Sequence, residues 1–100
     1  MKQISTYKFR KIFESGKDLL LIDVRDKSEF NSGHIPTAKN IPLCDIEDFS
    51  DEIPLNKDVY FICTHGNKSA RAVTLLNNLD IENVINIQGG MLCWDGKIEK

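Results

Sequence analysis

Three short apolar runs divide the chain, at residues 19–22, 59–62 and 84–87, and none alternates cleanly between apolar and polar positions. The third run is interrupted by Asn86. Apolar runs of this length that do not alternate are typical of strands buried on both faces of a parallel sheet. Residues 4–5 and 40–41 predict two further, brief strands.

Helical patterns lie between these runs. Residues 7–14 place their apolar side chains on one side of a helix. Residues 26–32 begin with Asp26 and Glu29, which predict a capping box, and end at Gly33.

The clearest helical pattern covers residues 69–79. It separates a polar stripe that includes Arg71 from an apolar stripe made of Ala72, Val73, Leu76 and Leu79. Strands that alternate with helices predict an α/β fold with a mostly parallel sheet. Such a sheet carries its ligand site beyond the carboxyl ends of its strands.

Composition and charge narrow the class of protein. The chain has 100 residues, of which 41% are hydrophobic and 28% charged, as expected for one globular domain over residues 1–100. The net charge of −2 without a charged run argues against nucleic acid or an anionic membrane surface as partner. No run approaches the ~20 apolar residues of a membrane span, and residues 1–10 lack the apolar core of a signal peptide. We therefore predict a cytoplasmic location.

The three cysteines are Cys44, Cys63 and Cys93, an odd number without a Cys-x-x-Cys pair. This argues against a disulfide framework. The histidines, His34 and His65, show no metal-ligand spacing with the cysteines, so we expect neither a metal nor a cofactor. A reactive cysteine remains to be identified.

Cys63 directly follows the central apolar run, and a short loop containing Gly66 leads to a helix expected from Ser69. Such a loop can turn successive N–H groups inward around an anion, and the first N–H groups of the helix point the same way. Lys68 and Arg71 add positive charge.

A cysteine in these surroundings favours its thiolate form and needs no separate base. A cysteine at a strand end is more often a small buried hydrophobe. The glycine loop, the two basic residues and Ser69 at a cap position favour the interpretation of Cys63 as a nucleophile.

The chain resembles the rhodanese family over nearly its whole length, through three motifs in the family's order. The active loop resembles Cys-x-x-Gly-x-Arg/Lys-Ser. The upstream signature includes Gly33-His34-Ile35-Pro36, and the third motif lies near the C-terminus. The matching segments are 21–25, 29–30, 33–36, Ala38, 40–42, 63–69, 89–91 and Trp94.

The resemblance implies a five-stranded, mostly parallel sheet flanked by helices on both faces, and a thiosulfate sulfurtransferase activity. Cys63 would take the outer sulfur of a donor such as thiosulfate, hold it as a persulfide and pass it to cyanide or a thiol, free or on a protein. Lys68 would hold the donor's oxygens, and Ser69 would donate to the sulfur or cap the helix. Backbone N–H groups would cradle the terminal sulfur, from Thr64, His65, Gly66, Asn67, Lys68 and Ser69.

Two other functions remain open. Phosphatase relatives of the family have a loop longer by one residue that ends in arginine, and that position is Ser69 here. The shorter loop favours sulfur over phosphate. Other rhodanese-like domains serve as binding or regulatory modules, and a sulfur relay with little turnover of small molecules belongs to the same alternative.

The remaining polar candidates near the predicted site have structural and functional interpretations. Asp23 and Arg25 either shape the substrate mouth or form a structural ion pair, which we favour. Glu29 is expected to support a helix start. Arg71 either raises the local potential or faces solvent.

The other histidine, cysteine and tryptophan residues, apart from His65, are expected to be structural. The resemblance places His34 in a structural turn, whereas His65 lies within the loop and is a candidate base. Cys44 is expected to be an ordinary packed or surface residue. Cys93 is expected to pack in the core, with the alternative that it resolves a persulfide on Cys63 or forms a disulfide with it. Trp94 is expected to anchor the final helix.

Overall fold

Each predicted strand is present in the computed structural model, which describes residues 1–100. The bounds agree with the sequence pattern to within two residues. The strands are β1 (Lys2–Ser5), β2 (Leu20–Asp23), β3 (Lys39–Asn40), β4 (Val59–Ile62) and β5 (Val84–Gln88). The helices are α1 (Thr6–Glu14), α2 (Lys27–Ser32), α3 (Ile46–Phe49) and α4 (Asn67–Asn78).

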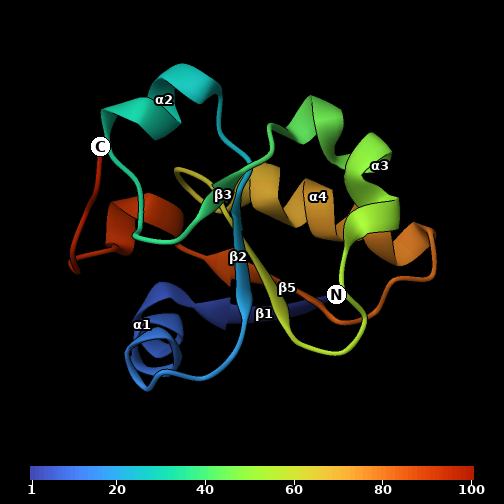
Figure 1. Cartoon of the computed structure of the whole chain (residues 1–100), viewed down its shortest axis with the longest axis horizontal. Helices are drawn as coiled ribbons and strands as arrows, with labels where there is room; N and C mark the ends of the chain where they lie inside the picture. Colours follow the sequence, from blue (N-terminus) through green and yellow to red (C-terminus); the bar gives the residue numbers. More distant parts are fainter.

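The five strands form one sheet in the order β1-β5-β4-β2-β3 (Figure 1). Every strand pair is parallel, so the expectation of a mostly parallel sheet is met in full. Phe61 of β4 lies level with Ile22 of β2 and with Asn86 of β5. This register brings the carboxyl ends of the three central strands to one edge of the sheet.

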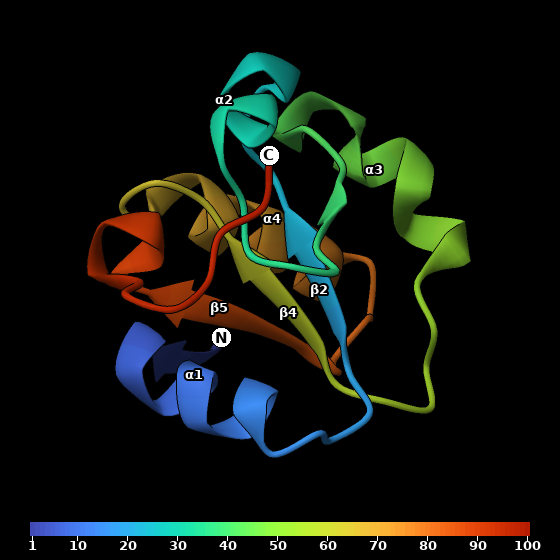
Figure 2. The same ribbon diagram turned by 60° about the vertical axis from the view of Figure 1, so that its left-hand side comes forward.

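Helices cover both faces of the sheet, as predicted (Figures 1 and 2). One face packs against α3 and α4 through a cluster that includes Phe49, Phe61 and Leu76. The other face packs against α1 and the segment around Trp94, which contacts Phe9. Trp94 is therefore a core residue, although it follows a short 3-10 turn, Gly90–Cys93, rather than lying in a final helix.

Local sequence accounts for where two of the helices begin and end. The side chain of Ser5 accepts a hydrogen bond from the Lys8 N–H and caps α1. On α4 the predicted apolar stripe is buried except at Leu79, which is 45% exposed. The prediction for Leu79 was wrong because α4 ends at Asn78, which leaves Leu79 outside the helix as its C-cap.

Residues 43–52 hold the structure that the sequence pattern did not predict. Two 3-10 turns, Leu43–Asp45 and Ser50–Glu52, flank α3 in this segment. Ile46 and Phe49 anchor it in the core beneath α4. A four-residue helix has too few positions to show a periodic pattern.

The C-terminal segment runs beside α2 (Figure 2). His34 and Glu99 pair there as an isolated antiparallel bridge, with two backbone hydrogen bonds. The chain contains no helix of the length and apolarity needed to cross a membrane.

Candidate active site

Cys63 follows the central strand β4 at the carboxyl edge of the sheet, where it is 2% exposed. Its Sγ accepts hydrogen bonds from the Gly66 N–H at 3.1 Å and the Ser69 N–H at 3.3 Å. Ser69 Oγ lies 3.3 Å from the same sulfur. Two main-chain donors and one hydroxyl therefore surround the sulfur.

Helix α4 begins at Asn67, two residues before the predicted start, and Gly66 is its N-cap. Gly66 has φ +104, a left-handed conformation that favours glycine. A Cβ at this position would also lie 3.1 Å from the Gly89 nitrogen. Ser69 therefore lies within the first turn, and the suggestion that it caps the helix was wrong. Its hydroxyl instead lies against Cys63.

The Gly90–Cys93 turn fixes the orientation of the loop. The Met91 N–H donates to the Cys63 carbonyl at 2.8 Å, and the Leu92 N–H donates to the Thr64 carbonyl at 3.1 Å. In a trans peptide the carbonyl and the following N–H point in opposite directions. The N–H groups of Thr64 and His65 therefore point away from this turn.

Four N–H groups of the loop and the first helical turn donate to no acceptor within the protein. They belong to Thr64, His65, Asn67 and Lys68. All four residues line a pocket of about 360 Å³ that reaches Cys63. Unpaired N–H groups at a helix N-terminus bind anions, so the pocket offers an anionic group several donors next to the sulfur.

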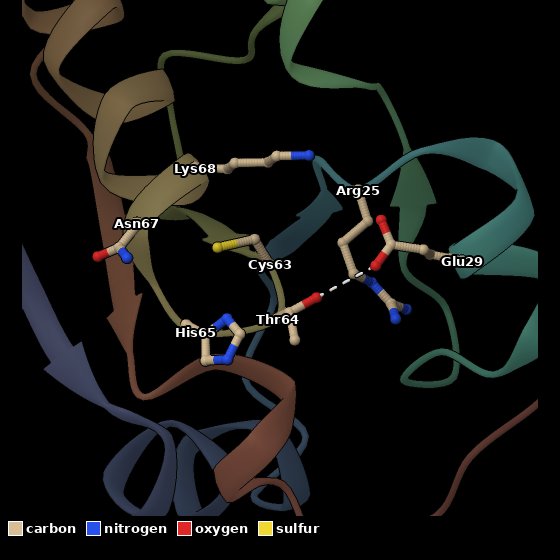
Figure 3. A pocket seen from close by; sticks show the side chains of 7 residues that line it. All are labelled: Arg25, Glu29, Cys63, Thr64, His65, Asn67 and Lys68. Carbon is tan, nitrogen blue, oxygen red and sulfur yellow. Dashed lines mark hydrogen bonds between the residues drawn. The ribbon is translucent and has the colours of Figure 1, made fainter.

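Charged side chains approach Cys63 from two sides of this pocket (Figure 3). Lys68 extends from the start of α4, and Glu29 extends from α2 on the opposite side. The seven lining residues are Arg25, Glu29, Cys63, Thr64, His65, Asn67 and Lys68. Of the predicted loop residues, only Gly66 and Ser69 are buried rather than lining the pocket, and both contact the sulfur.

Arg25 and Asp23 form a buried ion pair beside the pocket. Arg25 Nε lies 3.0 and 3.1 Å from the two carboxylate oxygens of Asp23, and Nη2 lies 2.8 Å from one of them. Nη2 also donates to the Gly33 carbonyl at 2.7 Å. This geometry agrees with the structural interpretation. Arg25 lines the pocket with its charge balanced, and Asp23 lies behind it, fully buried.

The capping-box interpretation of residues 26–32 was wrong. Asp26 is the N-cap of α2 by backbone conformation, but its side chain makes no capping hydrogen bond. Glu29 turns instead toward the active loop, where its carboxylate accepts a hydrogen bond from Thr64 Oγ1 at 3.4 Å (Figure 3). Glu29 therefore places a negative charge in the pocket.

Several other candidates lie outside the pocket. Arg71 is on the exposed face of α4 and faces solvent. His34 Nδ1 donates to the Phe30 carbonyl at 2.8 Å, and its ring stacks on Phe30, which makes it part of a structural turn. Cys44 is exposed. Cys93 is exposed as well, so the expectation that it packs in the core was wrong.

Asn86 is a residue of the site that the sequence analysis did not select. Its Oδ1 accepts a hydrogen bond from Ser69 Oγ at 2.5 Å, directly behind the sulfur. The available signal was the interruption of an apolar run by a polar residue. A polar side chain in a buried strand requires a partner, but the sequence pattern does not identify that partner.

Comparison with known proteins establishes the family. The sequence model of the rhodanese-like domain family matches residues 5–97 of the chain. This protein belongs to the rhodanese-like family. Relatives of this rhodanese-like chain are named as sulfur carriers or sulfurtransferases, which supports a role of the family in sulfur transfer.

Two relatives and one crystal structure illustrate the similarity. YrkF of Bacillus subtilis, provisionally named a sulfur carrier protein, is 34% identical over 97 residues, which are 97% of this chain and 52% of YrkF. The thiosulfate sulfurtransferase GlpE of Pseudomonas syringae is 36% identical over 75 residues, covering 75% of this chain and 71% of GlpE. The crystal structure of a rhodanese-like domain protein from Staphylococcus aureus has a TM-score of 0.90 at 34% identity, covering 99% and 97% of the two chains.

Proposed function

We propose that this rhodanese-like protein is a sulfurtransferase that carries a sulfane sulfur as a persulfide on Cys63. The donor is a small anion such as thiosulfate, and the acceptor is cyanide or a thiol, free or on a protein. The observation that carries the proposal is the set of four unpaired N–H groups in the pocket that reaches the Cys63 sulfur. The naming of GlpE as a thiosulfate sulfurtransferase supports the choice of donor.

In the first half of the reaction, the Cys63 thiolate attacks the outer sulfur of thiosulfate. A sulfur–sulfur bond forms to Cys63 while the sulfur–sulfur bond of thiosulfate breaks, and sulfite leaves with the electron pair. In the second half, the acceptor attacks the outer sulfur of the persulfide. That bond breaks, and Cys63 returns to its thiolate form, which completes a covalent double displacement.

The loop supports both halves without a separate base. The outer sulfur of the persulfide carries negative charge, which the unpaired N–H groups of Thr64, His65, Asn67 and Lys68 are placed to stabilise. The Lys68 ammonium group attracts the anionic donor. The Gly66 and Ser69 N–H groups stay with Sγ, so the attacking sulfur keeps its position when the outer sulfur is added.

Mass spectrometry of the intact protein tests this function directly. Reduced, folded protein is incubated with thiosulfate and desalted, and its mass is then measured. We expect the mass to increase by one sulfur atom, and treatment with a thiol should reverse the increase. Cys63→Ser should abolish the gain, whereas a variant carrying Cys44→Ser and Cys93→Ser should retain it. Failure to load from thiosulfate and from any other sulfane donor would refute the proposal.

The identity of the acceptor separates turnover of small molecules from a sulfur relay. Loading from thiosulfate with fast discharge to a protein thiol, but slow discharge to cyanide and small thiols, would assign the protein to a sulfur relay.

All three cysteines are unpaired in the structure. Unpaired cysteines are typical of reducing compartments, and this supports our proposal of a cytoplasmic location.

A further inference from the structure

Asn86 occupies a core position where the strand pattern calls for an apolar side chain. Side chains alternate along β5: Ile85 and Ile87 pack on the face covered by α1, whereas Val84 packs under α4. Asn86 shares the face of Val84 and is only 2% exposed. A buried carboxamide is costly unless it is hydrogen-bonded, and its partner here is a residue of the active site.

That partner is the Ser69 hydroxyl, which is fully buried and donates to Asn86 Oδ1 at 2.5 Å. The Ser69 hydroxyl oxygen also lies 3.3 Å from Cys63 Sγ. A serine hydroxyl has one proton to donate. With that proton directed at Asn86, the contact between Cys63 and Ser69 is a hydrogen bond only if the thiol S–H is its donor.

The arrangement therefore matches one charge state of the sulfur. In the thiol form, a chain of hydrogen bonds runs from Cys63 through Ser69 to Asn86. In the thiolate form the sulfur has lost its proton to solvent, and it is best stabilised when the Ser69 hydroxyl turns to donate to it. Asn86 and the thiolate thus compete for the same hydroxyl proton.

We propose that Asn86 is a positioning residue that holds the Ser69 hydroxyl proton away from Cys63 and so raises the pH at which the sulfur becomes reactive. Asn86 acts through Ser69 and does not contact the substrate. The inference rests on Cys63 being the reacting sulfur of the proposed function, but it is independent of the donor.

The other charged and titratable groups around Cys63 remain constant when Asn86 is replaced. Arg25, Glu29, His65 and Lys68 line the pocket, and Asp23 lies behind Arg25 in its ion pair. The β5 residues and the Gly90–Cys93 turn contribute no charged side chain. A difference between variants at position 86 therefore reports the hydrogen bond to Ser69.

The test measures how fast iodoacetamide alkylates Cys63 as a function of pH, in a background with Cys44→Ser and Cys93→Ser. Asn86→Leu keeps the branched shape but removes the acceptor. We expect the acid limb of the pH–rate profile to move down by about one pH unit, or about tenfold faster alkylation on that limb, since a hydrogen bond to a charged group has this order of strength. Asn86→Ala, which cannot overfill the core, should shift it in the same direction. An unchanged profile, or an upward shift, in folded protein would overturn the proposal.

Ser69→Ala completes the cycle. Without the hydroxyl, replacing Asn86 should leave the profile unchanged, because its effect passes through Ser69. A shift that persists in the Ser69→Ala background would contradict the proposal.

A matched control is Asn83→Ala, directly before β5, where the side chain donates to the carbonyls of Pro54 and Lys57. It should lower stability and leave the alkylation profile in place. Because alkylation requires no sulfur donor, a protein that shows the Asn86 effect but does not load sulfur would refute the proposed function alone.

Discussion

At the scale of single residues, the opposite charges of Lys68 and Glu29 set the electrostatic potential that an anion experiences in the pocket next to Cys63. Arg25 also lines the pocket, but Asp23 balances its charge. Lys68 and Glu29 face the pocket from opposite sides without such a partner (Figure 3). The electrostatic attraction of an anionic donor therefore depends on the difference between these two side chains.

Replacing Glu29 by Gln should increase the rate of sulfur loading from thiosulfate. The variant keeps an oxygen for Thr64 and removes one negative charge that repels a dianion. At a separation of about 7 Å in water, this repulsion corresponds to about 1 kcal/mol, or about a fivefold change in the second-order rate constant. The rate is measured by stopping the reaction at successive times and determining the fraction of sulfur-loaded protein by mass spectrometry.

Glu47→Gln is the matched control, because it removes the same charge from α3, outside the pocket. The rate should change little in this variant, and the effect of Glu29→Gln should decrease in high salt. Equal acceleration in both variants would show that only the net charge matters.

Sequence and structure agree best at the residues whose role is set by their neighbours in the chain. Cys63 and its loop were found because a strand end, a glycine and a basic residue follow one another there. Glu29 was assigned to a local capping box, whereas its carboxylate contacts Thr64, 35 positions away. Asn86 lies 17 positions from Ser69. Tertiary contacts of this kind leave no local pattern, which is why these two roles could not be predicted.

At the scale of elements, the active loop depends on the Gly90–Cys93 turn beneath it. The turn binds the carbonyls of Cys63 and Thr64 and thereby aims the following N–H groups. Gly90 makes this approach possible. It has φ +58, and a Cβ there would lie 2.6 Å from the Thr64 carbonyl oxygen. The glycines of the third family motif, at residues 89–91, thus allow the Gly90–Cys93 turn to pack against the active loop.

Gly90→Ala should therefore impair both stability and sulfur loading. We expect a loss of about 3 kcal/mol in the free energy of unfolding, from overpacking and from the left-handed backbone together. Urea denaturation measures this loss. Sulfur loading should also be slower in protein that remains folded, because the loop must move away from the turn.

Gly16→Ala provides the comparison, since Gly16 has φ +82 but a Cβ added there would meet no atom within 4 Å. It should lose only about 1 kcal/mol, from backbone strain, and load sulfur at the normal rate. Equal effects at the two glycines would refute a role for Gly90 in supporting the loop.

Element prediction succeeded where the periodic signal was long or the strand fully buried. The bounds of β4 agree with the apolar run at 59–62, and the start of α1 is one residue from the prediction. α4 begins two residues early because its cap is a left-handed glycine instead of a serine. α3 and its flanking turns were missed because their stability comes from burying Ile46 and Phe49 under α4.

At the scale of the whole molecule, the sheet separates two apolar clusters, and the titratable residue Tyr60 belongs to the one that packs against α1. Its ring packs 5.0 Å from that of Phe9, and the residue is 2% exposed. Burial, helped by the nearby Asp58 carboxylate, raises the pKa of Tyr60 above its ordinary value. The folded protein therefore keeps this proton at a pH where the unfolded chain loses it.

Stability should accordingly fall as the pH rises above about 10, where tyrosine ionises in the unfolded chain. The slope of the unfolding free energy against pH reports the difference in bound protons between the unfolded and folded states. Tyr60→Phe should reduce this difference by up to one proton in this pH range. Urea denaturation between pH 8 and about 11 measures the slope. Tyr7→Phe, at a side chain that is 68% exposed, should leave the slope unchanged, and an equal change in both variants would contradict the assignment.

The pairing of β1 with β5 has a consequence for the order in which the protein is made. β1 is the first strand of the chain, and its only neighbour in the sheet is the last. The turn that aims the loop N–H groups comes later still, at residues 90–93. A nascent chain on the ribosome therefore holds Cys63 before the strand and turn that complete its surroundings have been synthesised. During synthesis this thiol therefore lacks the Ser69–Asn86 hydrogen bond and the contacts with the Gly90–Cys93 turn that surround it in the folded protein.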